Sequence, residues 1–440
     1  MSRLARRVVR RIESWLAGLL AFGLAVALVL AGVALYALRA APGDWSHRVA
    51  IGPLGIDLSV PALARVATHP LGMRALAGRR FATRFGSVRV DVGADARTLV
   101  VTCAPCRVDA SSVSARPFRI ERVQLSVGQG EPNQLRGTLG LGAVQASWKA
   151  RLGARDGVVE VDLADAALAD IVAVFGSAIP EAARARIEGR GGAWLRVALP
   201  TGRYAVRPRL DGLAVSGLGT DGLVGAAPAP ACGRTPRAHR SAAPYGTWLP
   251  KAVIAAEDQR FLEHPGYDLA EMAAAWSSEG SPETQRRGAS TLSQQLAKLL
   301  YTGDEQSLAG KVRELLYAVE MERTLGKARV LQLYLAVAPW GDGQCGGEAA
   351  ALHYFGKHAA ALQPAEAVWM AGLLRNPELE LARGARGDAS GNARLASIAD
   401  GLQPLARGRR EALRDELDAW VPPLPVLARA GAAGHDLAAR

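Results

Sequence analysis

Cysteine is scarce in this sequence, since its 440 residues include only four, too few for the disulfide-dense scaffolds of small secreted proteins. Low-complexity composition is also absent, because 48 glycines and 24 prolines make up only about 16% of the chain. Hydrophobic residues account for 49% and charged residues for 21%, which excludes a disordered chain. The length exceeds that of most single compact domains, so we expect two folded units with accessory segments.

Only one hydrophobic run is long enough to cross a bilayer: Trp15 to Leu38, 24 residues without a formal charge. Five arginines lie in residues 1–14, and a single one, Arg39, directly follows the run. The positive-inside rule therefore predicts a cytoplasmic tail over residues 1–14, a transmembrane helix over residues 15–38 and an extracytoplasmic or periplasmic remainder. A cleaved signal peptide is the alternative, although its apolar core is usually only about 7–15 residues long.

The chain is strongly basic, with a formal net charge of +12 and a pI near 10.0. Such a charge indicates an anionic partner, which could be nucleic acid, an anionic bilayer or a phosphorylated lipid. Because the folded part is expected outside the cytoplasm, we predict no nucleic acid partner. Membrane phospholipid or a lipid-linked phosphate is favoured instead, at a single-pass protein of the cytoplasmic (inner) membrane.

Residues 45–223 show the alternation of apolar and polar side chains that is typical of strands. Val88, Val90 and Val92 alternate with Arg89 and Asp91, and similar runs recur up to Leu199, with glycine-rich joints between them. The sequence therefore predicts a β-rich envelope domain, with one helix at Leu163 to Phe175. No catalytic constellation is recognisable in it.

The Cys103-Ala-Pro-Cys106 sequence ends one of these strands. A thiol–disulfide redox motif needs its cysteines at the start of a helix, whereas the residues after Cys106 look extended. We therefore favour a structural disulfide, which an oxidising compartment permits. A zinc site would need two more ligands, and Cys232 and Cys345 lie far apart in sequence.

Residues 224–246 are rich in glycine, alanine and proline and form the best candidate for a linker. After the linker the apolar pattern becomes helical, which predicts a compact, mostly α domain over residues 247–380. We expect residues 381–440 to form a C-terminal helical tail, with an amphipathic helix around Arg409 to Trp420.

Four motifs of the helical region carry the polar side chains suited to catalysis. In order they are Glu257-Asp258-Gln-Arg-Phe261 with His264; Gly288-Ala-Ser290-Thr291 with Gln295 and Lys298; Lys311-Val-Arg-Glu314; and Gly346 to Lys357. Ser290 or Thr291 can cap a helix, on which Thr291, Gln295 and Lys298 share one face. A hydroxyl, an amide and an ammonium on one face form a donor surface suited to phosphate oxygens. Taken singly, each motif could equally be an ordinary solvated or capping sequence.

Together and in this order, the four motifs resemble those of the family 51 peptidoglycan glycosyltransferases, over residues 247 to 378. The resemblance implies a mostly α, lysozyme-like domain that polymerises lipid II into glycan strands, with inversion and release of undecaprenyl pyrophosphate. It also implies nascent glycan, membrane phospholipid and cell-wall synthesis proteins as partners. The chain departs from the family pattern at several positions: Ala274-Ala275, Glu279, Arg287, Leu299, Gly310, Gln332 and Ala336.

The resemblance also assigns roles to the motif residues. Glu257 matches the general base and Glu314 the second catalytic carboxylate, which organises the donor site and is a candidate ligand for a divalent cation, Mg²⁺ or Mn²⁺. No organic cofactor is expected. The remaining matches are substrate-binding residues: Asp258, Phe261, His264, Ser290, Thr291, Gln295, Lys298 and Lys311.

Two other functions stay open. A lytic transglycosylase would cleave glycan with one acidic glutamate and would not need the glutamine–lysine surface for pyrophosphate. A scaffold would bind lipid II or glycan without catalysis. No Ser-x-x-Lys, Ser-x-Asn or Lys-Thr-Gly signature of a transpeptidase follows the helical domain, so no peptide cross-linking activity is expected.

Overall fold

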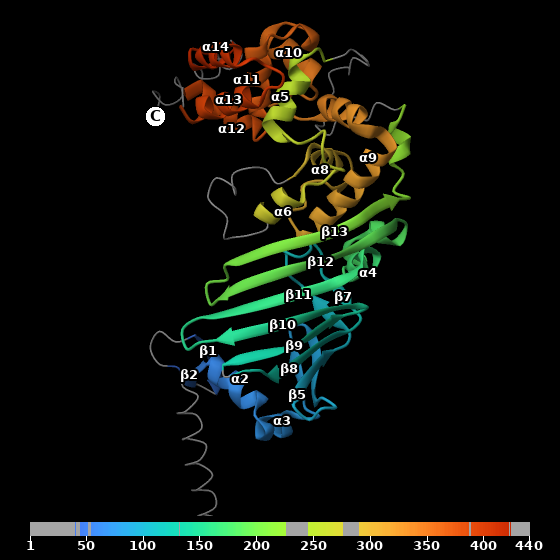
Figure 1. The fold of residues 1–440 in the computed structure, drawn as a ribbon, viewed down its shortest axis with the longest axis vertical. Helices are drawn as coiled ribbons and strands as arrows, with labels where there is room; N and C mark the ends of the chain where they lie inside the picture. The colour runs from blue at the N-terminus through green and yellow to red at the C-terminus, as the bar shows by residue number, and fades with distance from the viewer. Residues whose placement is uncertain are drawn as a thin grey trace, which may run out of the picture.

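The computed structural model describes residue 40 and residues 45–51, 54–131, 133–225, 245–275, 290–386, 389–421 and 423. The described chain forms a β part and a helical part, which stack along the long axis of the molecule (Figure 1). The expected transmembrane helix lies outside the described residues. Within the described ranges, no helix is both long and apolar enough to cross a membrane.

The β part begins with a hairpin of β1 (Ser46–Ile51) and β2 (Leu54–Ser59), followed by α2 (Val60–Thr68) and α3 (Pro70–Leu76). Ser59 caps α2 by accepting a hydrogen bond from the backbone N–H of Ala62. These two helices lie over one end of a large sheet (Figure 1), where Met73 packs with Val90 and Leu99.

That sheet contains nine antiparallel strands in the order β13-β12-β11-β10-β9-β8-β5-β4-β3. Their bounds are β3 (Arg80–Thr83), β4 (Gly86–Val92), β5 (Thr98–Cys103), β8 (Val123–Gln129), β9 (Gln134–Leu141), β10 (Val144–Leu152), β11 (Gly157–Ala167), β12 (Arg186–Leu199) and β13 (Tyr204–Ser216). Short strands β6 (Cys106–Val108) and β7 (Phe118–Ile120) form a separate pair. The predicted β-rich domain is thus confirmed.

The register gives the sheet two chemically different faces. Trp148 pairs with Val161, which pairs with Leu195, so these apolar side chains line one face. In the adjacent row of pairs, Lys149 pairs with Glu160, which pairs with Arg196, on the opposite face. The alternation read in the sequence therefore sets which face each side chain occupies.

Cys103 and Cys106 are joined by a disulfide between the end of β5 and the start of β6, so the expected disulfide is confirmed. Cys345 is disulfide-bonded too. The predicted helix at Leu163 to Phe175 is shorter than expected: β11 continues to Ala167, and α4 covers only Leu168–Ala173. Two short 3₁₀ turns follow, η1 (Gly176–Ala178) and η2 (Pro180–Ala183), and a third, η3 (Thr220–Leu223), closes the β part.

The helical part is built around a single apolar core. Its elements are α5 (Trp248–Glu257), α6 (Leu269–Ala275), α8 (Leu292–Ala297), the π turn η4 (Lys298–Thr302), α9 (Leu308–Val337), α10 (Gly347–Phe355), the 3₁₀ turn η5 (Ala359–Ala361), α11 (Pro364–Leu373), α12 (Pro377–Arg386), α13 (Ala389–Gly401) and α14 (Arg407–Asp418). Gly326 interrupts α9 with a positive φ of 71°, which divides it into two helical stretches.

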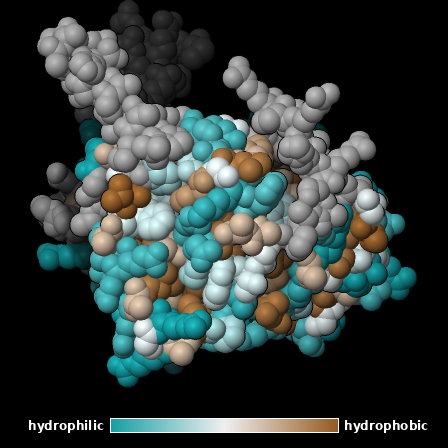
Figure 2. All heavy atoms as spheres, turned by 90° about the horizontal axis from the view of Figure 1, so that it is seen from above, coloured by the Kyte–Doolittle hydropathy of each residue, from teal (hydrophilic) through white to brown (hydrophobic). Residues whose placement is uncertain are grey.

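The core continues past residue 380, where the sequence predicts the end of the catalytic domain. Leu395, Ile398 and Leu413, from the expected tail, are buried in the same cluster as Leu249 of α5. The apolar stripes of α13 and α14 need a partner surface, and α5 and α11 provide it. Seen from this end, the surface mixes hydrophobic and hydrophilic residues (Figure 2).

The helical part contacts the sheet at its β13 edge, mainly through α6 and α9 (Figure 1). Most of the expected linker lies outside the described residues. The contact at β13 nevertheless means that the two parts share an interface and are not joined by the linker alone.

Candidate active site

Glu257, the expected base, is the last residue of α5, and its side chain is only 11% exposed. One carboxylate oxygen accepts a hydrogen bond from Nη2 of Arg394 at 2.8 Å, and the other accepts one from Nε2 of Gln295 at 3.2 Å. The hydroxyl of Tyr334 donates to Oε1 of Gln295 at 2.9 Å, which fixes the orientation of the amide. Two elements besides α5, α8 and α13, therefore hold this carboxylate directly, and α9 acts on it through Gln295.

Burial raises the pKa of Glu257 above the ordinary value for a glutamate, because a charged carboxylate loses its hydration there. The guanidinium of Arg394, the amide of Gln295 and the more distant charge of Arg375 oppose this rise. A carboxylate with a raised pKa is a better proton acceptor near neutral pH, which is what a general base requires.

Glu314 is the second buried carboxylate, with 2% of its side chain exposed. Nζ of Lys311, one turn earlier on α9, donates to it at 2.7 Å and to Oγ of Ser290 at 3.2 Å. Burial raises the pKa of Glu314, while the charges of Lys311 and Lys298 lower it. The structure thus brings Ser290, Lys298, Lys311 and Glu314 into one electrostatic neighbourhood.

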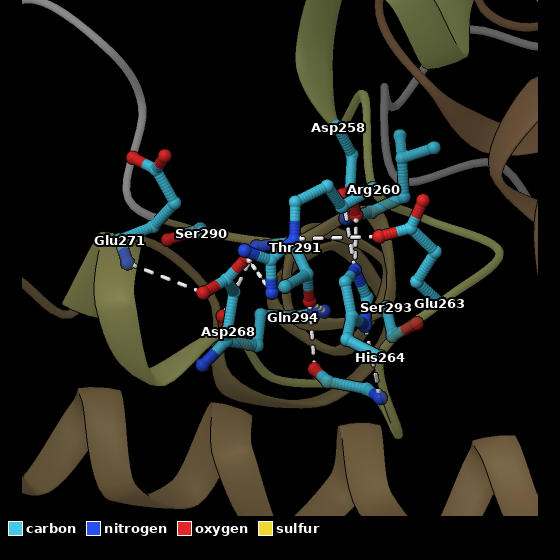
Figure 3. Close-up of polar contacts among 12 residues, drawn as sticks. Asp258, Arg260, Glu263, His264, Asp268, Glu271, Ser290, Thr291, Ser293 and Gln294 are labelled. Carbon is cyan, nitrogen blue, oxygen red and sulfur yellow. Dashed lines mark hydrogen bonds and ion pairs between the residues drawn. The ribbon is translucent and has the colours of Figure 1, made fainter.

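Asp258 and His264 stabilise the turn after α5. They do not form part of an exposed substrate-binding surface. Nε2 of His264 lies 3.0 Å from each carboxylate oxygen of Asp258, and both side chains are almost completely buried. Asp258 also accepts a hydrogen bond from the backbone N–H of Leu292, at the start of α8. Figure 3 shows the Asp258 and His264 side chains directed toward each other. This pair therefore fastens the end of α5 to the start of α8.

Phe261 is a correction to the expected substrate-binding residues. Its side chain is completely buried in the apolar core, and Nζ of Lys327 lies 4.5 Å from the centre of its ring. A ring without exposed surface cannot contact a substrate, so Phe261 supports the turn by packing.

Thr291 is a second correction, because its hydroxyl is already used. It donates to the carbonyl of Gly266 at 2.7 Å and accepts from the backbone N–H of Gln294 at 3.2 Å, in the capping box that starts α8 (Figure 3). Gln295 likewise donates its amide hydrogens to Glu257 and to the carbonyl of Ser290. Neither side chain has a hydroxyl or amide proton left for a phosphate in this arrangement.

Lys298 remains available to an anion. Its side chain is 33% exposed, and its present partner, Asp304 at 2.8 Å, is 92% exposed and so easily displaced by a stronger anion. Lys298 also begins the π turn η4, where the sequence predicts regular helix. Such turns often occur at functional sites because they change the direction of the side chains on a helix.

Arg394 and Tyr334 belong to the site but were not predicted as site residues. Arg394 lies in the segment expected to be a separate tail, 137 positions from Glu257, and no motif in the sequence marks it. Tyr334 appears in the sequence as one more apolar residue of α9 and is 3% exposed. Only the packing of α13 and α9 against α5 and α8 reveals their roles.

No group of three or more histidine, cysteine, aspartate and glutamate side chains that could hold a metal ion occurs in the part of the chain that the structure describes. A site of the kind that Mg²⁺ uses with phosphate substrates needs only one or two carboxylates. Glu314 offers one such carboxylate.

Residues 233–399 match the transglycosylase family model. The helical part of the chain is therefore a transglycosylase-family domain. The family resemblance read from the four motifs is thus confirmed, and its match extends through α12 and most of α13.

Curated proteins similar to this chain are named biosynthetic peptidoglycan transglycosylase. The one from Nitrosomonas eutropha is 43% identical over 129 residues, 29% of this chain and 53% of its own length. The one from Thiobacillus denitrificans is 41% identical over 139 residues, 31% and 60% of the two chains. An Escherichia coli protein of this name is 45% identical over 130 residues, 30% and 54% of the two chains. The chain spans about half the length of these relatives, and its β part lies outside the transglycosylase match.

Proposed function

We propose that this chain is a membrane-anchored peptidoglycan glycosyltransferase that polymerises lipid II into glycan strands. Transfer would proceed with inversion at the donor sugar and release undecaprenyl pyrophosphate. The transglycosylase-family domain and the names of its relatives support this class of reaction.

One observation carries the proposal: two buried carboxylates from distant motifs converge on the start of α8. Glu257 reaches it through Gln295, and Glu314 reaches it through Lys311 and Ser290. Buried carboxylates with raised pKa values are costly for a fold and are typical of acid–base sites. A scaffold would have no chemical need for either.

Glu257 would act as the general base. An acceptor sugar hydroxyl is too weak an acid to ionise near neutral pH, so its proton must be removed as its oxygen attacks the anomeric carbon of the donor. The ion pair with Arg394 favours the charged form of the buried carboxylate, and the bond from Gln295 sets its orientation.

The lysines would act on the leaving group. Negative charge develops on the pyrophosphate as the glycosidic bond to it breaks, and a fixed ammonium stabilises this charge most when water is excluded. Lys298 is partly exposed, and Lys311 lies beside Glu314, so the proposal places the donor pyrophosphate near these two side chains.

A divalent cation is part of the proposal. Glu314 would hold it as a single carboxylate ligand, together with pyrophosphate oxygens, and the cation would supply charge neutralisation when bound. We also propose attachment to the cytoplasmic membrane through residues 15–38, with the folded part outside the cytoplasm. Phospholipid and other cell-wall synthesis proteins would be its neighbours there.

Incubation of the purified full-length protein with labelled lipid II, followed by gel separation of the polymer, tests this function. Glu257→Gln keeps shape and hydrogen bonding but cannot accept a proton, so it should abolish polymer while lipid II still binds. Glu263→Gln is the matched control, because Glu263 follows in the same motif and its side chain is 72% exposed. Polymer made by Glu257→Gln at the wild-type rate would refute the base assignment.

Two other results would replace the proposal. Binding of lipid II or glycan without polymer from the wild type would indicate a scaffold. Cleavage of preformed glycan would indicate a lytic transglycosylase.

A further inference from the structure

The start of α9 presents two functional faces. Lys311 and Glu314 point toward Ser290 and the active site, whereas Arg313, between them in sequence, points toward the β part of the chain. Neighbouring residues on a helix diverge by about 100°, so a force on Arg313 acts on the same turn that carries both site residues.

Arg313 is held by a buried carboxylate from the β part. Its Nε and Nη2 donate to the two oxygens of Glu181, both at 2.8 Å, and its Nη1 donates to Glu305 at 3.0 Å. The Glu181 side chain is 4% exposed and that of Arg313 is 16% exposed. Two parallel hydrogen bonds between a guanidinium and a carboxylate fix orientation as well as distance.

Other groups of the β part hold the same helix. Backbone carbonyls of Ser112 and Val113 accept hydrogen bonds from the first two residues of α9, each at 2.9 Å. Arg184 donates to the hydroxyl of Tyr317 at 2.7 Å. The α9 segment from residue 308 to residue 317 is thus fixed from the β side along its whole length.

A second buried carboxylate crosses the same interface, but this one belongs to α9 and accepts hydrogen bonds from the β part. Glu320 of α9, only 2% exposed, accepts hydrogen bonds from the backbone N–H groups of Leu218 at 2.8 Å and Gly219 at 3.1 Å. Buried charges paired across an interface favour one arrangement, because any slip leaves a charge without its partner. The interface therefore has one preferred register.

We propose that Glu181 of the β part is a positioning residue for the donor side of the transglycosylase site. By holding Arg313, it fixes the turn of α9 from which Lys311 and Glu314 reach the donor pyrophosphate. This assignment rests on the proposed function, and it gives the β part an indirect role in catalysis, through Arg313 and α9.

Loss of the Glu181 charge leaves Arg313 with a single carboxylate partner, Glu305. The turn of α9 that carries Arg313 is then held less firmly against the β part, so Lys311 and Glu314 on the same turn lose part of their fixed geometry. Donor binding should weaken, whereas Glu257, held from α8 and α13, keeps its geometry. We therefore expect a rise in KM for lipid II of about threefold to thirtyfold, with a smaller change in kcat.

Full-length Glu181→Gln, compared with Glu188→Gln, tests the role. Glu188 is the matched control, since it is a glutamate of the same part whose ion pair with Arg186 is exposed. Two readouts are needed: KM and kcat for polymerisation, and hydrogen exchange of the amides between residues 305 and 317. We expect both the rise in KM and faster exchange in that segment for Glu181→Gln alone, and partial recovery of both in Glu181→Asp.

A KM like that of the control, or unchanged exchange over residues 305–317 in folded Glu181→Gln, would overturn the positioning role. If the wild type makes no polymer, the proposed function fails, while the exchange measurement still decides whether Glu181 positions α9. If Glu181→Gln does not fold, Arg313→Lys keeps the charge but loses the paired hydrogen bonds, and should give the same two changes.

Discussion

Removal of Arg394 should change the pH dependence of polymerisation more than its maximum rate. Glu257 accepts a proton only in its ionised form, so the rate falls as the pH drops below the pKa of this carboxyl. Burial raises that pKa, and Arg394 opposes the rise. In Arg394→Gln the pKa of Glu257 should therefore rise further, and the acidic limb of the pH–rate profile should move to higher pH.

The structure gives the size of the effect. The Arg394 and Glu257 side chains are 21% and 11% exposed and lie 2.8 Å apart, so solvent screens the pair only partly. A hydrogen bond to a charged group typically contributes about 1.5–3 kcal/mol. This corresponds to about a tenfold to hundredfold change in the ratio of ionised to protonated Glu257. On the acidic limb the variant should lose activity by that factor, and above the limb it should retain most of its rate.

Polymerisation rates measured at saturating lipid II across the acidic and alkaline range provide the assay. The other groups that face Glu257 are Gln295 and Tyr334, which stay in place, and Arg375, which acts only through its charge. Arg407→Gln is the control, since its side chain in α14 is 90% exposed. An equal loss at every pH would mean that Arg394 serves only the packing of α13, and an unchanged profile would refute its influence on the base.

Three further predictions concern charge, stability and topology. Lys298→Ala should slow polymerisation by about a hundredfold or more, because a cation near the developing pyrophosphate charge is lost; unaltered turnover by the folded variant would contradict this. Asp258→Asn removes the carboxylate that contacts the buried His264 and accepts from the Leu292 N–H, and should lower the free energy of unfolding by about 1.5–3 kcal/mol, measured by denaturant titration. A loss below 1 kcal/mol would show that the pair is not a stabilising element. A reporter enzyme fused after Arg440 should be active only outside the cytoplasm, and cytoplasmic activity would exclude the proposed anchor.

Local patterns determined much of this fold. Strand alternation predicts which side chains share a face of the sheet, because the period of a strand is two whatever its neighbours are. Similarly, the helical apolar pattern after the linker predicted the mostly α part of the chain, whose first helix, α5, begins at Trp248. The motif glutamates could be found because they stand in short, ordered sequences with characteristic spacing.

Tertiary packing decided what each motif side chain does. Thr291 and Phe261 look like site residues in the sequence, yet Thr291 caps α8 and Phe261 lies in the core. The role of a hydroxyl or a ring depends on which groups pack around it, and only the folded chain determines those groups. Arg394 and Glu181 are 137 and 132 positions from the residues they hold. No local pattern marks such pairs, since a contact over that separation exists only once helices and sheet have packed and excluded water from the charges between them.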